Sequence, residues 1–232
     1  KWFDTSDSQW VTVGDNKYSD ATVFSFHPVK MITTGEGGAV TCDDRFIYEK
    51  CLSLRSHGVR REPNEYVGVK EGEIWPFQQF SLGYNYNITE FQAALGLSQL
   101  KKLATFLELR SEVARKYIAN LGHLPLTLPK PSDFVQSTWH LFPIMIDAAH
   151  DLSSKVRLFQ FLVDNEIHVS VHYAPIYLQP LYSAQGFRRG YCPNAEDYFM
   201  RGISLPIFCE LSDGQQDYVV NKISEWFRNE SG

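Results

Sequence analysis

The feature that most constrains this chain is a long helical pattern between residues 87 and 121. Apolar side chains recur there at near-helical spacing, at Ile88, Phe91, Leu95, Leu100, Leu103, Leu107, Val113, Tyr117 and Leu121. Two start signals are present, because Asn87 with Glu90 and Thr89 with Gln92 both have the spacing of a capping box. The pattern predicts a helix to about Asn120, either continuous or broken once.

Prolines follow this helical pattern directly. Pro125, Pro129 and Pro131 lie within residues 122–131, and proline continues neither a helix nor the interior of a sheet. We therefore expect an interdomain boundary here, with residues 1–122 in one domain and residues 123–232 in another. A chain of 232 residues is long enough for one large domain or two modest ones.

The first of these domains mixes strand and helix patterns. Residues 21–26 alternate as a strand, and residues 39–42 read as the next strand, before a helix that starts at Asp44. Residues 56–80 show little periodicity, which predicts a long functional or mobile loop. The opening residues are polar and turn-rich and begin with lysine, so we expect the chain to be incomplete at its front.

The second domain alternates strand and helix patterns. The predicted strands cover residues 140–146, 167–172 and 203–208. The predicted helices cover residues 153–165, a short stretch near Ala195 and residues 213–227. This order predicts a small α/β domain of about three strands.

Composition excludes several classes of protein. The net charge of -5 and the scattered Lys and Arg residues give no reason to expect a nucleic-acid partner. No apolar run approaches the roughly 20 residues of a membrane span, and no secretory leader opens the chain, so we expect a cytoplasmic protein without a membrane partner. The four cysteines lack zinc-site spacing, which predicts buried free thiols and no metal.

One lysine stands at a position where chemistry is commonly built. Pro28 ends the strand pattern, so Lys30 falls in the turn beyond it, and glycines at 35, 37 and 38 follow. A lysine amine in such a place can act as a nucleophile towards a carbonyl cofactor, of which pyridoxal phosphate is the obvious one. Most lysines are solvated surface groups, so position alone leaves both interpretations open.

Longer motifs resolve this ambiguity. The run from Ser25 to Lys30, with residues 33–39 after it, resembles the cofactor-lysine segment of the DegT/DnrJ/EryC1 family of sugar aminotransferases. Five further segments resemble family motifs in the family's order, at residues 55–58, 83–86, 91–96, 139–143 and 171–176. The wording His-Pro-Val-Lys is most similar to the subgroup that makes UDP-4-amino-4,6-dideoxy-N-acetyl-beta-L-altrosamine for pseudaminic acid.

The resemblance implies an α/β fold of type I, the fold of many pyridoxal phosphate-dependent transferases. Residues 1–122 would then be the C-terminal part of the large cofactor-binding domain with its long connecting helix, and residues 123–232 the small domain. The family's aspartate for the pyridine nitrogen would fall at or before the first residue, and Asp4 and Asp7 do not stand in its pattern. The chain therefore resembles a C-terminal fragment of such an enzyme.

The resemblance also implies roles for single residues. Lys30 would bind pyridoxal phosphate covalently and later move the substrate proton, and Ser25 would hydrogen-bond the cofactor phosphate. Asn85 would reach the phosphate in the neighbouring subunit, which implies a homodimer with shared active sites. Without the family, Ser25 is equally a strand serine bonded to backbone and Asn85 a turn residue before a helix. Asn87 replaces a family arginine, which leaves it the role of an N-cap.

Other residues have weaker claims on the site. His140, His172 and Tyr173 match positions where the family lines the sugar site, although lone histidines are more often structural. Glu36 lies in the glycine-rich turn, either as a solvated carboxylate or as a substrate contact.

The implied reaction moves the amino group of L-glutamate to a UDP-linked 4-keto-6-deoxy sugar. Two alternatives stay open. A sugar dehydratase of the same family has histidine in place of the lysine, so Lys30 argues against it. A non-catalytic remnant or binding module is the alternative of another class, because the partner of the pyridine nitrogen is missing.

Overall fold

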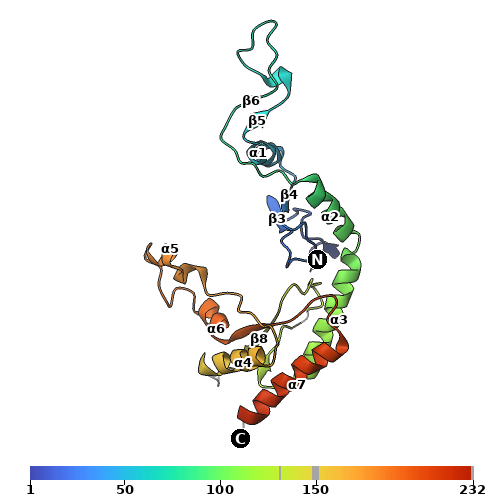
Figure 1. Cartoon of the computed structure of the whole chain (residues 1–232), viewed down its shortest axis with the longest axis vertical. Coiled ribbons are helices and arrows are strands. Elements are labelled where there is room, and N and C mark those ends of the chain that lie inside the picture. Colours follow the sequence, from blue (N-terminus) through green and yellow to red (C-terminus); the bar gives the residue numbers. More distant parts are fainter. Residues whose placement is uncertain (131, 148–151, 231–232) are drawn as a thin grey trace. The chain divides into compact units, whose positions relative to one another are not determined.

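The computed structural model describes residues 1–130, 132–147 and 152–230, so Pro131 lies outside the described residues. The chain forms two compact units (Figure 1). Unit 1 comprises Lys1–Leu103 with Phe134–Gln136, and unit 2 comprises Ala104–Asp133 with Ser137–Gly232. The expected domain boundary, between residues 1–122 and 123–232, stays a prediction.

Two antiparallel hairpins open unit 1. Strands β1 (Trp2–Asp4) and β2 (Gln9–Val11) form the first, within the stretch that the sequence marks as turn-rich. Strands β3 (Ala21–Ser25) and β4 (Gly38–Cys42) form the second, which confirms both predicted strands. Helix α1 (Arg45–Arg55) follows and begins at the predicted cap, since the Asp44 carboxylate accepts from the Ile47 amide at 2.9 Å.

The predicted long helix is broken once, between α2 (Glu90–Leu100) and α3 (Leu103–Leu121). Thr89 is the N-cap of α2, in a complete capping box with Gln92. The N-cap role expected for Asn87 is therefore wrong. Its side chain instead accepts from the Ser56 hydroxyl at 3.0 Å and donates to the Arg55 carbonyl at 3.3 Å, which ties it to the end of α1.

The predicted long loop contains only short elements. Strands β5 (Val59–Arg60) and β6 (Gln78–Gln79) pair over two residues. A single 3-10 turn, η1 (Pro63–Glu65), lies between them.

Unit 2 is built on a three-stranded antiparallel sheet in the order β7 (Leu126–Thr127), β8 (Phe142–Ile146), β9 (Gly202–Leu205). The strand predicted over residues 167–172 is wrong, because only Ser170 pairs, in a single bridge with Ser204. The third strand is β7, which is too short and too close to prolines to show an alternating pattern.

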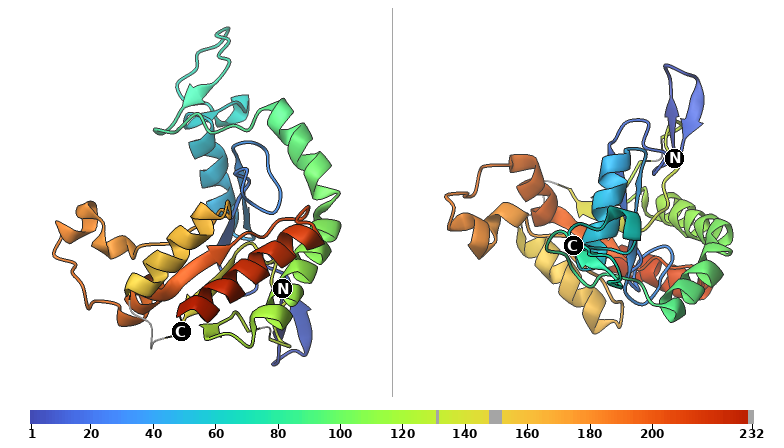
Figure 2. Two further views of the ribbon diagram at one scale, coloured as in Figure 1. Left: turned by 60° about the horizontal axis from the view of Figure 1, so that its bottom comes forward. Right: turned by 90° about the horizontal axis from the view of Figure 1, so that it is seen from above.

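Among its described residues, unit 2 also contains five helical segments after β8. They are α4 (Leu152–Asp164), η2 (Ile176–Leu178), α5 (Pro180–Ser183), α6 (Pro193–Arg201) and α7 (Asp213–Glu230). Figure 2 shows α4, α7 and β9 close together, and their side chains fill the core with those of β8 and α3. Along β8 burial alternates between consecutive residues, as expected when one face of a sheet meets the core.

The core is distributed unevenly. The hydrophobic core cluster lies wholly in unit 2, with Tyr117, Phe142, Ile144, Leu158 and Ile223 at 0% exposure. Among the described residues of unit 1, Val11 is the only fully buried hydrophobic side chain. Unit 1 instead exposes Ile74, Leu82 and Phe91 at 95%, 88% and 91%.

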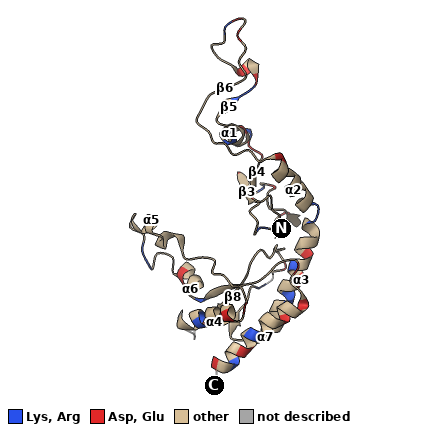
Figure 3. Cartoon of the chain, in the orientation of Figure 1, with Lys and Arg blue, Asp and Glu red and all other residues tan. Residues whose placement is uncertain are grey.

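Surface charge in unit 2 is mixed. Residues of both signs lie along α3 and α7 (Figure 3), and Lys116 pairs with Asp213 at 3.1 Å and with Asp217 at 2.8 Å across these two helices. None of the described helices is long and apolar enough to cross a membrane.

Candidate functional site

Lys30 lies in a tight turn just beyond the end of β3. Its backbone amide donates to the His27 carbonyl at 2.9 Å, as expected for a turn that starts at Pro28. The side chain is half-buried. None of the described residues forms a hydrogen bond or ion pair with its amine.

The loop that carries Lys30 is closed at its base. The Phe26 amide donates to the Gly37 carbonyl and the Thr34 amide to the Phe26 carbonyl, both at 2.9 Å. The Thr33 hydroxyl also donates to the Phe26 carbonyl, at 3.0 Å. Residues 26–37 are therefore a closed loop extending from the β3–β4 hairpin, with a defined backbone path.

Ser25 and Glu36 belong to the same loop. The Ser25 hydroxyl lies at the end of β3, where it accepts weakly from the His27 amide at 3.4 Å. The Glu36 carboxylate is 78% exposed and lies 3.9 Å from His27 Nε2. Its backbone carbonyl is better anchored, since it accepts from Thr34 Oγ1 at 2.7 Å and from Gln92 Nε2 at 3.0 Å.

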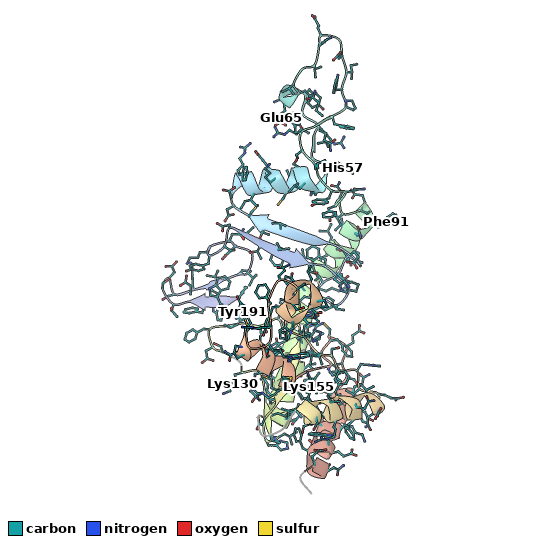
Figure 4. The ribbon with its side chains drawn as sticks, turned by 90° about the vertical axis from the view of Figure 1, so that its left-hand side faces the viewer. His57, Glu65, Phe91, Lys130, Lys155 and Tyr191 are labelled. Atoms are coloured by element: carbon teal, nitrogen blue, oxygen red, sulfur yellow. The ribbon has the colours of Figure 1, made fainter. Side chains whose placement is uncertain are left out.

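Asn85 lies on a different segment of unit 1, docked on the C-terminal end of α1. It pairs with Ser56 in an isolated bridge. The neighbouring Tyr84 amide donates to the Leu54 carbonyl at 2.6 Å, and the amide of His57, labelled in Figure 4, donates to the Tyr84 carbonyl at 2.8 Å. Asn85 itself is exposed at this position. The structure thus carries Lys30, Ser25 and Glu36 on one loop and Asn85 on another segment of unit 1.

His172 and Tyr173 form a small cluster in unit 2. His172 Nδ1 lies 2.9 Å from the hydroxyl of buried Ser204, so a hydrogen bond joins it to β9. Its ring meets that of Tyr173 edge-on, with 4.7 Å between centroids. Tyr173 is 73% exposed, whereas His172 is partly buried.

A buried arginine that the sequence analysis missed lies beside His140. Arg110 is 8% exposed, and its Nη1 donates to the carbonyls of Trp139, His140 and Ile207 at 3.1, 3.4 and 3.0 Å. The signal that could have revealed it is a charged residue at an apolar position of the helical pattern, between Leu107 and Val113. Arg110 fixes the backbone on which His140 stands.

Two further charged groups in unit 2 are structural. Burial lowers the pKa of the Lys155 ammonium, labelled in Figure 4, which lies 4.6 Å from the centre of the Phe199 ring and donates to the Phe199 carbonyl. Hydrogen bonds from the Tyr177 hydroxyl at 2.5 Å and the Gly190 amide at 2.6 Å lower the pKa of the Glu196 carboxyl. Glu196 thereby ties the loop before α6 to that helix.

Asp4 in unit 1 is fully engaged. Its carboxylate accepts from Lys17 Nζ and from Ser6 Oγ, both at 2.5 Å, and also from the Tyr18 hydroxyl. These contacts, that of Lys17 first, hold the pKa of the Asp4 carboxyl well below its usual range. Asp4 is therefore a structural anchor of the first hairpin, in keeping with its absence from the family's aspartate pattern.

Metal ligands do not gather in the part of the chain that the structure describes, where no three His, Cys, Asp or Glu side chains form a group. The four cysteines, Cys42, Cys51, Cys192 and Cys209, are free thiols, as predicted. Their predicted burial is wrong, because Cys192 is exposed and the other three are only partly buried.

A comparison with models of known protein families finds a match over a range that includes the Lys30 loop. Residues 6–224 match the model of the DegT/DnrJ/EryC1/StrS aminotransferase family, so the chain belongs to this family. The predicted fold class, α/β of fold type I, is confirmed for the portion of the fold that the chain represents.

Several of the similar proteins are named as sugar transaminases or aminotransferases. The chain is 36% identical to the UDP-4-amino-4,6-dideoxy-N-acetyl-beta-L-altrosamine transaminase of Campylobacter jejuni, over 84% of this chain and 49% of the relative. The structure of Helicobacter pylori PseC, an aminotransferase involved in the biosynthesis of pseudoaminic acid, matches with a TM-score of 0.81 and 33% identity, over 91% of this chain and 54% of PseC.

A third match concerns the cofactor. The PLP-form of the putative sugar aminotransferase Spr1654 from Streptococcus pneumoniae matches with a TM-score of 0.82 and 27% identity, over 93% of this chain and 53% of that protein. Pyridoxal phosphate is thus the cofactor that family membership implies. The chain spans about half the length of the curated relatives it matches.

Proposed function

We propose that the intact protein is a pyridoxal phosphate-dependent aminotransferase that moves the amino group of L-glutamate to a UDP-linked 4-keto-6-deoxy sugar. The product would be used in the biosynthesis of pseudaminic acid or a related surface glycan. The observation that carries this proposal is the half-buried Lys30, whose amine has no partner among the described residues, in the loop whose sequence matches the family. The named relatives support the sugar substrate.

Residues of this chain suit the cofactor. Lys30 has an amine without a partner among the described residues, which suits covalent attachment of the cofactor. Ser25 has a hydroxyl at the end of β3, which suits a hydrogen bond to the phosphate. Bound pyridoxal phosphate supplies an electron sink that acidifies the substrate C–H bond. The Lys30 amine, once released, would then be the base that takes up that proton and returns it. Asp4 is engaged by Lys17 and Tyr18, so we do not assign its carboxylate to the ring nitrogen.

Further residues would act around this centre. Asn85 would contact the cofactor phosphate of the partner subunit, and its exposed position beside the C-terminal end of α1 agrees with a role in a shared site. His140, His172 and Tyr173 would line the sugar site, and Glu36 would contact the substrate through its exposed carboxylate. We also infer a homodimer, for which the exposed apolar side chains of unit 1 provide surface. The cytoplasmic location stays a prediction.

The alternatives are less well supported. The family's dehydratases have histidine at the position of Lys30, which favours amino transfer. If the chain is a non-catalytic remnant, the Lys30 amine has no role, although the loop that carries it matches the family. To test for a remnant, the 232-residue chain can be mixed with pyridoxal phosphate, since a remnant gives no change in absorption.

The decisive experiment replaces the lysine. We expect the intact protein to show the visible absorption band of a lysine-bound cofactor, and Lys30→Ala to abolish it. Borohydride trapping followed by peptide mass mapping should place the label on Lys30. Lys70→Ala is the matched control, because Lys70 is an exposed lysine of the long loop. An unchanged band in Lys30→Ala, or a label on another residue, contradicts the proposal.

A further inference from the structure

The carbonyl of Glu36 connects the lysine loop to helix α2. It accepts one hydrogen bond from within the loop, from Thr34 Oγ1 at 2.7 Å. It accepts a second from α2, from Gln92 Nε2 at 3.0 Å. A carbonyl oxygen has two lone pairs, so this acceptor is fully used, and its position is fixed from two directions.

Gln92 performs two tasks with one amide. Its Oε1 accepts from the Thr89 amide at 2.9 Å and from the Thr89 hydroxyl at 3.0 Å, which completes the capping box at the start of α2. Its Nε2 makes the bond to Glu36, 56 residues earlier in the chain. The amide cannot rotate to satisfy one partner without losing the other, so the start of the helix and the loop are held in one arrangement.

Thr34 packs into a space kept free by two glycines. Its side chain is 3% exposed. A Cβ atom added at Gly37 would lie 2.3 Å from Thr34 Oγ1, and one added at Gly96 of α2 would lie 2.8 Å from Thr34 Cγ2. Both distances are shorter than a van der Waals contact permits. The loop therefore meets α2 at Thr34 as well as at Glu36, on the side of Lys30 that leads to β4.

We infer that Gln92 and Thr34 are positioning residues that hold the Lys30 loop against α2. The inference rests on the proposed function, because it assigns to these contacts the placement of the reactive amine. Neither side chain needs to touch the cofactor. Both fix the backbone of residues 26–38, from which the Lys30 side chain extends, and small errors in placing a reacting group cost large factors in rate.

A single substitution separates the two tasks of Gln92. In Gln92→Glu the carboxylate still accepts from Thr89, and glutamate is a normal capping-box residue, so the start of α2 is kept. The donor to the Glu36 carbonyl is lost, because an ionised carboxylate only accepts. Gln99→Glu is the matched control, since it adds the same charge to the same helix at a side chain for which no hydrogen bond with the described residues is found.

The first measurement is amide hydrogen exchange of the segment 26–38 in the intact protein, followed by mass spectrometry. We expect exchange roughly twofold to tenfold faster in Gln92→Glu than in the wild type, as for the loss of one net hydrogen bond. Gln99→Glu should exchange like the wild type. This readout does not depend on the cofactor, so it tests the contact with α2 even if Lys30 proves not to be the cofactor lysine.

The second measurement is the rate of the half-reaction with L-glutamate, followed through the visible band. We expect kcat to fall by about tenfold to a hundredfold in Gln92→Glu, with cofactor content and KM unchanged. Thr34→Val, which keeps the shape but removes the hydroxyl, should lower kcat in the same way. Unchanged exchange overturns the contact, and faster exchange with an unchanged kcat overturns the positioning role. A band that survives Lys30→Ala overturns the proposed function instead.

Discussion

Arg110 shows how a buried charge can be stabilised without a carboxylate. Its guanidinium donates to three backbone carbonyls, which come from the segments before β8 and after β9. Hydrogen bonds from a charged donor are stronger than neutral ones. The residue therefore joins α3 to the sheet of unit 2, at the segment that contains His140 and leads into β8.

We predict that Arg110→Met destabilises the protein by about 2–4 kcal/mol, because three carbonyl oxygens lose their donor in a buried place. Urea denaturation followed by circular dichroism measures the free energy of unfolding. Arg115→Met is the control, because Arg115 is an exposed residue of the same helix and should change the free energy by less than about 0.5 kcal/mol. Equal effects of the two substitutions would show that the carbonyl contacts contribute nothing.

At single residues, the sequence predicted what depends on near neighbours. The turn at Lys30 follows from Pro28 and the glycines beside it, and the structure confirms that turn. The role of Asn87 was missed because its partners, Ser56 and Arg55, lie about 30 residues away in the chain. The same reason hid Arg110, whose three carbonyl acceptors are distant in sequence. The catalytic and binding roles of the site residues stay predictions.

Among the secondary-structure elements, long amphipathic helices were predictable and short strands were not. The break between α2 and α3 was one of two outcomes that the pattern allowed. Strand β7 has two residues, too few for an alternating pattern. Residues 167–172 have a strand-like composition, yet only Ser170 finds a partner strand. Pairing depends on the neighbouring chain, and a local pattern does not contain that information.

A glycine of α2 provides a test of how this helix meets the lysine loop. Gly→Ala inside an exposed helix normally stabilises it by about 1 kcal/mol. We predict the opposite for Gly96→Ala, a loss of about 1–3 kcal/mol, because the new methyl group would press on the stiff, buried side chain of Thr34. Thermal unfolding of the intact protein measures the change.

The double variant Gly96→Ala with Thr34→Ser is the matched control. Serine lacks the Cγ2 methyl that the new Cβ would meet, so we expect it to recover most of the stability that Gly96→Ala loses. If Gly96→Ala is stabilising, or if the serine fails to rescue it, the packing of Thr34 against α2 is not as described.

For the whole molecule, the division of the core predicts how the units fold. Unit 2 contains the hydrophobic core cluster and a complete three-stranded sheet. Unit 1 has Val11 as its only fully buried hydrophobic side chain among the described residues, and Phe91 on α2 is 91% exposed (Figure 4). Burial of apolar surface is the main source of stability. We therefore expect unit 1 to need further protein surface for its stability and unit 2 to be stable by itself.

We predict that a piece comprising residues 104–232 folds alone and unfolds cooperatively in urea. The complementary piece, residues 1–103, should show no cooperative transition, because it lacks a buried apolar core. Circular dichroism and tryptophan fluorescence should give coincident transitions for the first piece. A cooperative transition in the second piece would mean that the hairpins of unit 1 are stable without a core.

The pairing of β1 with residues 134–136 has a consequence for synthesis on the ribosome. Trp2 bridges to Val135, and the Phe3 amide donates to the Phe134 carbonyl at 2.7 Å. At about 5–20 residues per second, translation needs roughly 7–27 seconds to reach this partner after β1 is made. During that time the nascent chain presents an open strand edge, which is the kind of edge that mispairs with other chains.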